Sequence, residues 1–264
     1  MGKKALAVLR KDVANILREA IDGEVLLKEV FSQGDGDGVE LYPSVCSSWL
    51  FYLDSVLLDR DICETDTEYL QLLPYITFVS DSADGKYNIL TYQRGKGGDE
   101  SRLHSKYSVG IGGHVESYVT EETTLLDVLV ETALREMEEE IGVSLDQIEA
   151  GSSIEEMSDT FRDDFFEQTR MIYCNNDEGS VHLGLSIVLF IPAEMLSKMV
   201  GENNVITNLQ LVPATKEAFS AFNLEPWSAA VLDNLIPALE TVVATNKQAE
   251  GGVYEELKIV TTES

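Results

Sequence analysis

The stretch R-E-M-E-E-E-I-G-V at residues 135–143 decides how this chain folds and what it binds. Glu136, Glu139 and Glu140 stand at i, i+3 and i+4, so a helix turning about 100° per residue gathers them within one arc. Packed carboxylates destabilise a helix unless a cation neutralises them. Clustered oxygen ligands suit a hard cation such as Mg²⁺ or Mn²⁺. The stretch therefore predicts a metal-binding helix, although a solvated acidic face would show the same residues.

The opposite side of the same segment is apolar, which predicts an amphipathic helix over residues 124–141. Its apolar side chains recur at helical spacing: Leu126, Val130, Ala133, Leu134, Met137 and Ile141. Gly142 follows them and fits a helix stop. One face of the helix is thus expected in a core, with the acidic face outside it.

A glycine-rich turn, G-I-G-G-H-V-E at residues 110–116, precedes the helix. Two adjacent glycines let the backbone approach a ligand closely. A turn of this kind followed by R-E-x-x-E-E resembles the signature of the Nudix hydrolases, G-x5-E-x7-R-E-U-x-E-E-x-G-U, where U is a bulky apolar residue. The second half of the signature matches residues 135–143 at every fixed position.

The first half of the signature departs in register. Gly113 and Glu116 resemble the opening G-G-x-x-E, but Asp127 stands where the family has the glutamate that begins the helix. The spacing from Gly113 to Asp127 is longer than the signature allows, so residues 118–124 read as an inserted loop. The metal helix stays intact, and the role of Asp127 stays open.

Further segments resemble a bacterial and phage subgroup of Nudix proteins known as predicted phosphoesterases. They lie at residues 71–75, 94–104, 108–114 and 181–184, within a likeness spanning roughly residues 60–235. The resemblance implies an α/β fold, a Nudix-like α/β/α sandwich with a mixed sheet. Here a mainly helical N-terminal extension would precede it.

Three regions are expected along the chain. Residues 1–66 would form an accessory segment packed on the catalytic domain, residues 67–248 the Nudix hydrolase domain, and residues 249–264 a C-terminal tail. Residues 4–31 show the apolar spacing of a helix. Strands are expected at 75–80, 87–93, 107–111, 147–156, 169–175 and 181–191, and helices at 193–200, 214–222 and 226–245.

The resemblance implies that a phosphoanhydride is hydrolysed with Mg²⁺ or Mn²⁺ as cofactor. Glu136, Glu139 and Glu140 would hold the cation, and a backbone carbonyl near Gly112 would add a ligand. Arg135 lies one turn from Glu139, close enough to orient it, so Glu139 is the first candidate for the general base.

Another candidate base is a carboxylate beyond the signature, and residues 155–156 supply two. The substrate class implied is a nucleoside diphosphate linked to another group. A polyanion of this kind needs local positive charge in so acidic a chain. Basic and imidazole side chains within the resembling segments are therefore candidates for substrate binding: Arg94, Arg102, His104, Lys106, His114 and His182. Arginine offers bidentate donors to phosphate, which favours Arg102.

Composition restricts the partners. The formal net charge is −28, from 47 acidic and 19 basic residues. Nucleic acids and anionic membranes attract basic surfaces, so neither is expected as a partner. Three cysteines without C-x-x-C spacing predict reduced thiols and a cytoplasmic location. The partner expected is a nucleotide-type small molecule, and a homodimer is compatible with the sequence.

Other functions stay open. A domain of this kind can bind a nucleotide without hydrolysing it, as a sensor or regulatory module. The intact set of acidic residues argues against a pure binder. Isomerase chemistry on a prenyl diphosphate would require a cysteine near the glycine turn, and none of the three lies there. A purely structural acidic protein is the remaining alternative.

Overall fold

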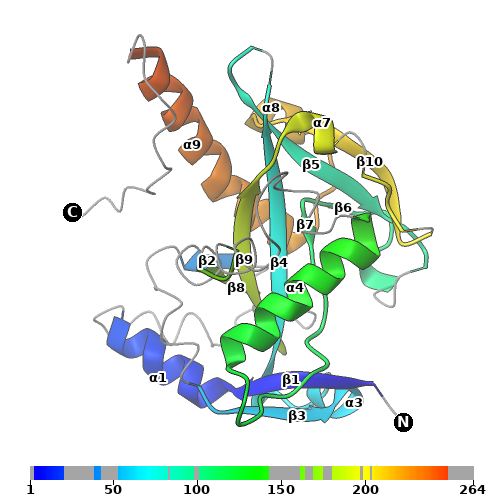
Figure 1. The fold of residues 1–264 in the computed structure, drawn as a ribbon, viewed down its shortest axis with the longest axis vertical. Helices are drawn as coiled ribbons and strands as arrows, with labels where there is room; N and C mark the ends of the chain where they lie inside the picture. Colours follow the sequence, from blue (N-terminus) through cyan, green and yellow to red (C-terminus); the bar gives the residue numbers. More distant parts are fainter. Residues whose placement is uncertain are drawn as a thin grey trace.

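The computed structural model describes residues 3–20, 39–42, 53–82, 84–97, 101–142, 161–163, 169–174, 180–196, 199–202 and 204–248. Ten strands form one mixed sheet (Figure 1). The strands are β1 (Lys4–Leu9), β2 (Val39–Tyr42), β3 (Ser55–Asp59), β4 (Tyr69–Asp81), β5 (Tyr87–Arg94), β6 (Tyr107–Ser108), β7 (Gly110–Ile111), β8 (Arg170–Cys174), β9 (His182–Phe190) and β10 (Ile206–Pro213). The helices are α1 (Arg10–Ala20), α3 (Arg60–Cys63), the 3-10 turn η2 (Ser101–Leu103), α4 (Leu125–Ile141), α7 (Ala193–Leu196), α8 (Lys216–Phe219) and α9 (Pro226–Gln248).

Strand β4 is the centre of the sheet. It pairs in parallel with β9 and antiparallel with β1, β5 and β7. The order β10-β5-β4-β9-β8-β2 continues to both sides of it. Strands β4 and β5 form the antiparallel hairpin that the sequence predicted, with Val79 opposite Ile89.

Helices α4 and α9 cover opposite faces of this sheet. Successive side chains of β4 point to opposite faces and pack against one helix or the other. Ile76 and Phe78 belong to the hydrophobic cluster that contains the apolar face of α4. Tyr75 and Val79, which point the other way, belong to the cluster that contains α9. The result is an α/β/α sandwich with a mixed sheet, so the predicted fold class is confirmed (Figure 1).

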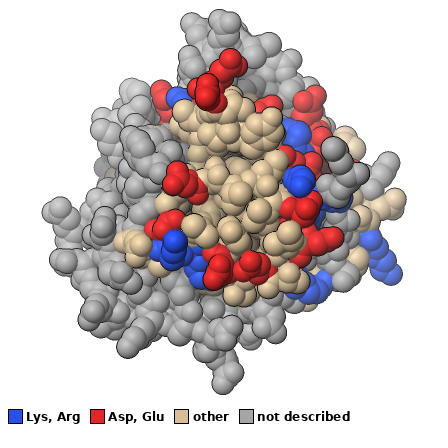
Figure 2. All heavy atoms as spheres, turned by 90° about the horizontal axis from the view of Figure 1, so that it is seen from below, with Lys and Arg blue, Asp and Glu red and all other residues tan. Residues whose placement is uncertain are grey.

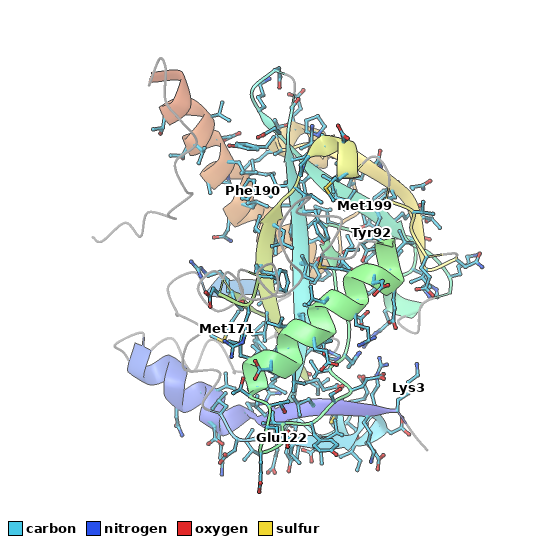
Figure 3. The ribbon with its side chains drawn as sticks, in the orientation of Figure 1. Lys3, Tyr92, Glu122, Met171, Phe190 and Met199 are labelled. Carbon is cyan, nitrogen blue, oxygen red and sulfur yellow. The ribbon has the colours of Figure 1, made fainter. Side chains whose placement is uncertain are left out.

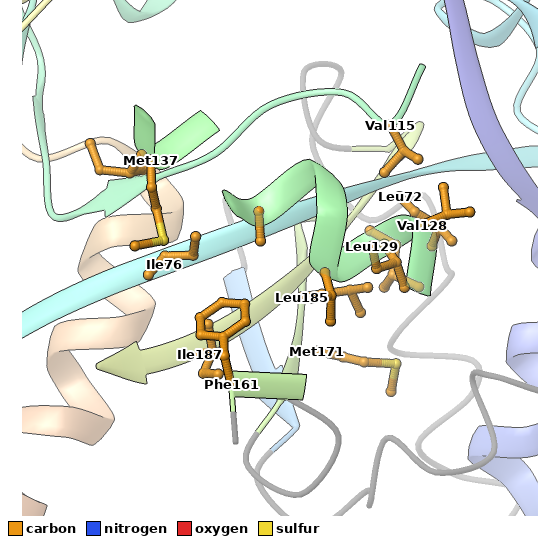
Figure 4. Packing of buried hydrophobic residues seen from close by; sticks show 14 of the residues in the cluster. Leu72, Ile76, Val115, Val128, Leu129, Met137, Phe161, Met171, Leu185 and Ile187 are labelled. Carbon is orange, nitrogen blue, oxygen red and sulfur yellow. The ribbon is translucent and has the colours of Figure 1, made fainter. Parts of the chain in front are cut away.

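The larger cluster lies between α4 and the sheet. Leu129 and Met137 of α4 are fully buried there, together with Leu72 and Leu185 of the strands (Figure 4). Met171 of β8 belongs to the same cluster, and Figure 3 shows it beside the lower-left end of α4. This packing fixes α4 against β4, and therefore fixes the direction of its acidic face.

The helix expected over residues 4–31 is wrong at its beginning, because residues 4–9 form β1. Leu6 belongs to the large cluster, whereas Ala5 and Ala7 belong to a small one beside Cys63. That alternation has the period of a strand, and a short apolar run does not distinguish the two periods in sequence. The helix begins at Arg10 and is described to residue 20, and residues 21–31 lie outside the described residues.

The remaining expectations agree in position. Helix α4, strands β8 and β9, and helices α7, α8 and α9 occupy the predicted regions, although α7 and α8 are shorter than expected. The strand at 107–111 is divided into β6 and β7, and β10 was not predicted. The strand expected at 147–156 and the tail at 249–264 lie outside the described residues. Among the described residues, no helix has the length and apolarity to cross a membrane.

A buried polar network joins the sheet to α9. The Glu225 carboxylate, 3% exposed, receives hydrogen bonds from the hydroxyls of Tyr75 (2.8 Å) and Ser108 (2.7 Å). Arg94 Nε lies 2.6 Å from Glu225 Oε2. Burial alone would raise the pKa of Glu225, but the Arg94 charge and these donors hold it below its usual range. The network therefore holds a full ion pair inside the fold.

We expect Glu225→Gln to lower the free energy of unfolding by about 3 kcal/mol, because it leaves the Arg94 guanidinium buried without its counter-charge. Asp59→Asn is the matched control. It breaks the exposed pair with Lys4, whose side chains are 43% and 52% exposed, and should change stability by less than about 1 kcal/mol. Urea unfolding followed by circular dichroism measures both. Equal effects of the two variants would contradict the structural role of the network.

Candidate active site

Helix α4 begins and ends with strong local signals. Thr124 caps its N-terminus: its hydroxyl accepts from the Asp127 amide, while the Asp127 carboxylate accepts from the Thr124 amide at 2.7 Å. This is a capping box, so Asp127, whose role the sequence left open, anchors the start of the helix. Its other carboxylate oxygen binds Arg162 Nε at 2.8 Å. At the far end, Gly142 ends the helix in the left-handed conformation, with φ at 67°.

The glycine turn is pressed between β4 and α4. A Cβ atom at Gly112 would stand 1.8 Å from the Pro74 carbonyl oxygen, and one at Gly113 would stand 2.5 Å from Glu136 Oε1. Gly112 has no room for a side chain against the β4 backbone, whereas a side chain at Gly113 would require the Glu136 carboxylate to move. Arg135 fixes the turn from the helix side: Nη2 donates to the His114 carbonyl at 3.2 Å and lies 2.6 Å from Glu136 Oε1. The two signature segments are therefore in direct contact.

A cavity of about 450 Å³ opens beside this contact. Strand β4, the glycine turn, helix α4, the N-terminal segment and the start of α9 all contribute to its wall. Its charged and imidazole lining comprises Lys3, Arg60, Arg94, Arg102, His104, His114, Glu116, Glu136, Glu140, His182, Glu202 and Glu225. The backbone of Gly112 lines it as well.

Two of the three predicted metal carboxylates lie in this cavity, and both have raised pKa values. Burial raises the pKa of Glu136 above its usual range, and the charge of Glu139 adds to this effect. Burial raises the pKa of Glu140 to about 8; Glu136 adds to it, while Arg94 and the Gly112 amide oppose it. Glu140 Oε2 is buried and has no hydrogen-bond partner among the described residues.

The third carboxylate, Glu139, is placed differently. Its side chain is 58% exposed, and Oε2 lies 2.7 Å from Arg135 Nη1. Among the described residues, Glu139 is not part of the cavity wall. Arg135 does orient Glu139, as the spacing suggested, while its other nitrogen holds Glu136.

The predicted substrate-binding residues divide into two groups. Arg102, His104, His114 and His182 line the cavity, as does Arg94, whose guanidinium is already paired with Glu225. Lys106 is absent from the wall as far as the described residues define it. Two further cations of the wall, Lys3 and Arg60, were not predicted, because they lie in the N-terminal segment, outside the segments that resemble the Nudix subgroup.

A second cluster combines one carboxylate with the two imidazoles of His114 and His182, which line the cavity. Glu64 Oε1 lies 3.7 Å from His182 Nε2 and 3.9 Å from His114 Nε2. Interaction with His182 lowers the pKa of Glu64 to about 2, against the effect of burial. Burial lowers the pKa of His114 to about 3, and the Arg60 charge acts in the same direction. No sequence signal linked Glu64 to the histidines, which are distant in the chain.

The buried carboxylates fit a divalent cation. Glu136 and Glu140 bring two oxygen-ligand groups into one cavity, and Glu116 acts on Glu136 as a third nearby negative charge. The unpartnered Glu140 oxygen is what a site lacking its counter-ion would show. Glu116 stands three residues after Gly113, in the part of the sequence that resembles the opening of the signature, but it was not predicted as a site residue.

Comparison with solved structures decides the fold family. Tm1382, a protein classed as a Nudix hydrolase, superposes with a TM-score of 0.53 at 20% identity, covering 89% of this chain and 99% of Tm1382. The chain has the Nudix fold. A Nudix hydrolase from Alicyclobacillus acidocaldarius gives a TM-score of 0.43 at 15% identity, over 66% of this chain and 96% of its own.

Comparison of sequences gives a likeness to a bacterial protein. Protein YmaB of Bacillus subtilis is 26% identical over 176 residues, which cover 67% of this chain and 76% of YmaB. No protein-family model matches the chain. The resemblance read from the signature is confirmed at the level of the fold, and α4 carries the R-E-x-x-E-E residues.

We expect the raised pKa of Glu140 to make stability depend on pH in the absence of divalent cations. Between about pH 4.5 and pH 8, folded Glu140 keeps a proton that the unfolded chain has lost, so stability falls as pH rises. The variant Glu140→Gln removes this dependence. As pH increases through that window, its free energy of unfolding should rise relative to that of wild type by on the order of 1 kcal/mol per pH unit.

Chemical unfolding at a series of pH values measures the difference. Glu138→Gln, on the exposed side of the same helix, is the matched control and should show no such trend. Adding Mg²⁺ at pH 8 should stabilise wild type more than Glu140→Gln. A constant difference between wild type and Glu140→Gln from pH 5 to pH 8 would show that Glu140 is not held protonated.

Proposed function

We propose that this protein is a divalent-metal-dependent hydrolase that cleaves the phosphoanhydride of a nucleoside diphosphate linked to another group. The observation that carries the proposal is the pair Glu136, which is buried, and Glu140, which is partly buried and has one buried oxygen without a partner among the described residues. Both lie in a cavity whose wall also carries guanidinium groups. Carboxylates for a cation and arginines for phosphate are the two requirements of this chemistry.

Glu136 and Glu140 would hold Mg²⁺ or Mn²⁺, with the backbone near Gly112 as a further oxygen ligand. Once bound, the cation supplies charge neutralisation of the diphosphate and activation of a water molecule. The chain's own contribution is the fixed direction of both carboxylates, which the core side of α4 and the Arg135–Glu136 contact secure.

The phosphate groups would be bound by cations of the wall. Arg102 is the first choice, because it lies in η2 beside the cavity and offers two parallel donors. Arg60 and Lys3 supply positive charge from the N-terminal side. Arg94 is held by Glu225 and would act through its charge rather than by moving toward the substrate.

Glu139 is proposed as the general base, oriented by Arg135 at 2.7 Å. Because Glu139 is exposed, its side chain would have to rotate toward the bound substrate. Catalytic contacts often form only when substrate binds, so the present distance does not exclude this role. The alternatives at residues 155–156 lie outside the described residues. Glu116, in the cavity wall, is the candidate base should Glu139 prove dispensable.

The remaining assignments are also proposals. Residues 67–248 would form the catalytic domain, with residues 1–66 as an accessory segment and residues 249–264 as a tail. The substrate would be a nucleotide-type small molecule in the cytoplasm. Figure 2 shows acidic side chains, with basic ones among them, around an uncharged centre on one face of the molecule. The cations of the cavity wall would supply positive charge for an anionic substrate.

The decisive test is turnover by purified full-length protein with Mg²⁺ or Mn²⁺. Nucleoside triphosphates, nucleotide sugars, dinucleoside polyphosphates and dinucleotide cofactors form the panel, and released phosphate or nucleotide is measured. We expect one class to be cleaved and the cleavage to stop with a chelator. Saturable binding without turnover would instead identify a nucleotide sensor.

We expect Glu139→Gln to reduce kcat by about 10²- to 10⁴-fold, the usual contribution of a general base, without unfolding the protein. Glu138→Gln serves as its control, since Glu138 is the neighbouring exposed glutamate and is not in the proposed site. Steady-state kinetics on the cleaved substrate, with circular dichroism spectra of both variants, test the assignment. A wild-type rate in Glu139→Gln would transfer the role to another carboxylate.

A further inference from the structure

We propose that Glu64, His114 and His182 form a second metal site, which takes a first-row transition-metal cation such as Zn²⁺ rather than Mg²⁺. The site differs from the carboxylate site of α4 in its ligands, because it offers two imidazole nitrogens and one carboxylate. Imidazole ligands suit Zn²⁺ and related ions, whereas Mg²⁺ prefers oxygen alone.

The distances within the cluster suit a bridging ion better than direct hydrogen bonds. One ligand atom from each of the three residues lies within 4.8 Å of the others. Glu64 Oε1 is 3.7 Å from His182 Nε2 and 3.9 Å from His114 Nε2, both too long for a hydrogen bond. Metal bonds of about 2.1 Å hold two ligand atoms roughly 3 to 3.5 Å apart, so a small contraction would complete the site.

The state of His114 is the strongest single observation. Its side chain is 12% exposed, and Nε2 is buried with no hydrogen-bond partner among the described residues. A buried polar atom without a partner needs an explanation, and a metal ion is one of the few that fit a nitrogen facing a carboxylate.

Neighbouring groups hold the ligands in place, as groups around metal sites do. Arg60 Nε donates to Glu64 Oε1 at 3.3 Å, whereas Gln71 Nε2 lies 3.1 Å from His182 Nε2, the nitrogen that would bind the ion. The His114 carbonyl is held by Arg135. With the ion bound, the Gln71 amide would have to leave the His182 nitrogen and turn toward Glu64.

The site would face the same cavity as the carboxylates of α4. His114 and His182 both line that cavity, so a bound ion would keep open positions toward a ligand there. An ion with three protein ligands and an open side is typical of sites that bind an anionic or water ligand. Its existence does not depend on hydrolysis, because binding itself is the prediction.

The test is metal binding by the full-length chain after removal of metals with a chelator. We expect wild type to bind Zn²⁺ with X-ray absorption features of two imidazole ligands, even with excess Mg²⁺ present. The variants Glu64→Gln, His114→Gln and His182→Gln should each weaken Zn²⁺ binding by at least about 10- to 100-fold, the loss seen when even a group supporting a ligand is removed.

His104→Gln is the matched control, because His104 is the chain's third histidine and lines the cavity outside the cluster. It should keep the imidazole features and the affinity, as should Glu140→Gln in the carboxylate site. Circular dichroism shows which variants fold, and Glu64→Gln makes the smallest change of shape. Wild-type Zn²⁺ affinity in the folded cluster variants, or bound Zn²⁺ without imidazole features, would overturn the proposal.

Discussion

The site depends on the contact between the glycine turn and helix α4. A side chain at Gly112 would meet the Pro74 backbone, and one at Gly113 would displace the Glu136 carboxylate. That approach buries Glu136 and Glu140 within a wall that also contains Glu116. Buried carboxylates repel one another and lose hydration, so the fold creates a strong demand for positive charge at one place. The signature residues therefore determine how the turn packs against α4, and this packing places the carboxylates.

The N-terminal segment completes the cavity that this contact begins. Strand β1 pairs with β4, and the Leu6 amide bonds to the Val115 carbonyl at 2.7 Å, directly after the glycine turn. Residue 3 precedes β1, and Arg60 and Glu64 belong to α3 and its end. A segment that reads as an accessory layer thus supplies charge to the wall and a carboxylate to the histidine cluster.

Sequence pattern was sufficient where spacing is local. The helix at 124–141, its acidic face and the strands that pair beside it follow from periodicity within one element. The misassigned start at residues 4–9 and the unpredicted strand β10 are short segments whose state is set by pairing across the sheet. The same reasoning explains the site: Glu136 and Glu140 share a helix, whereas Glu64 meets His182 only through the folding of β4 beside β9.

Charge balance in the wall shows why metal and substrate binding should be coupled. Arg94 and Glu225 neutralise each other, which leaves Lys3, Arg60 and Arg102 facing Glu116, Glu136, Glu140 and Glu202. With Glu140 protonated, these three cations face three charged carboxylates, so a diphosphate entering alone would meet no excess of positive charge. A divalent cation on the carboxylates makes the wall net positive, which favours the binding of phosphate. Binding of the cation would therefore raise the affinity for the anion, and by linkage the anion would raise the affinity for the cation.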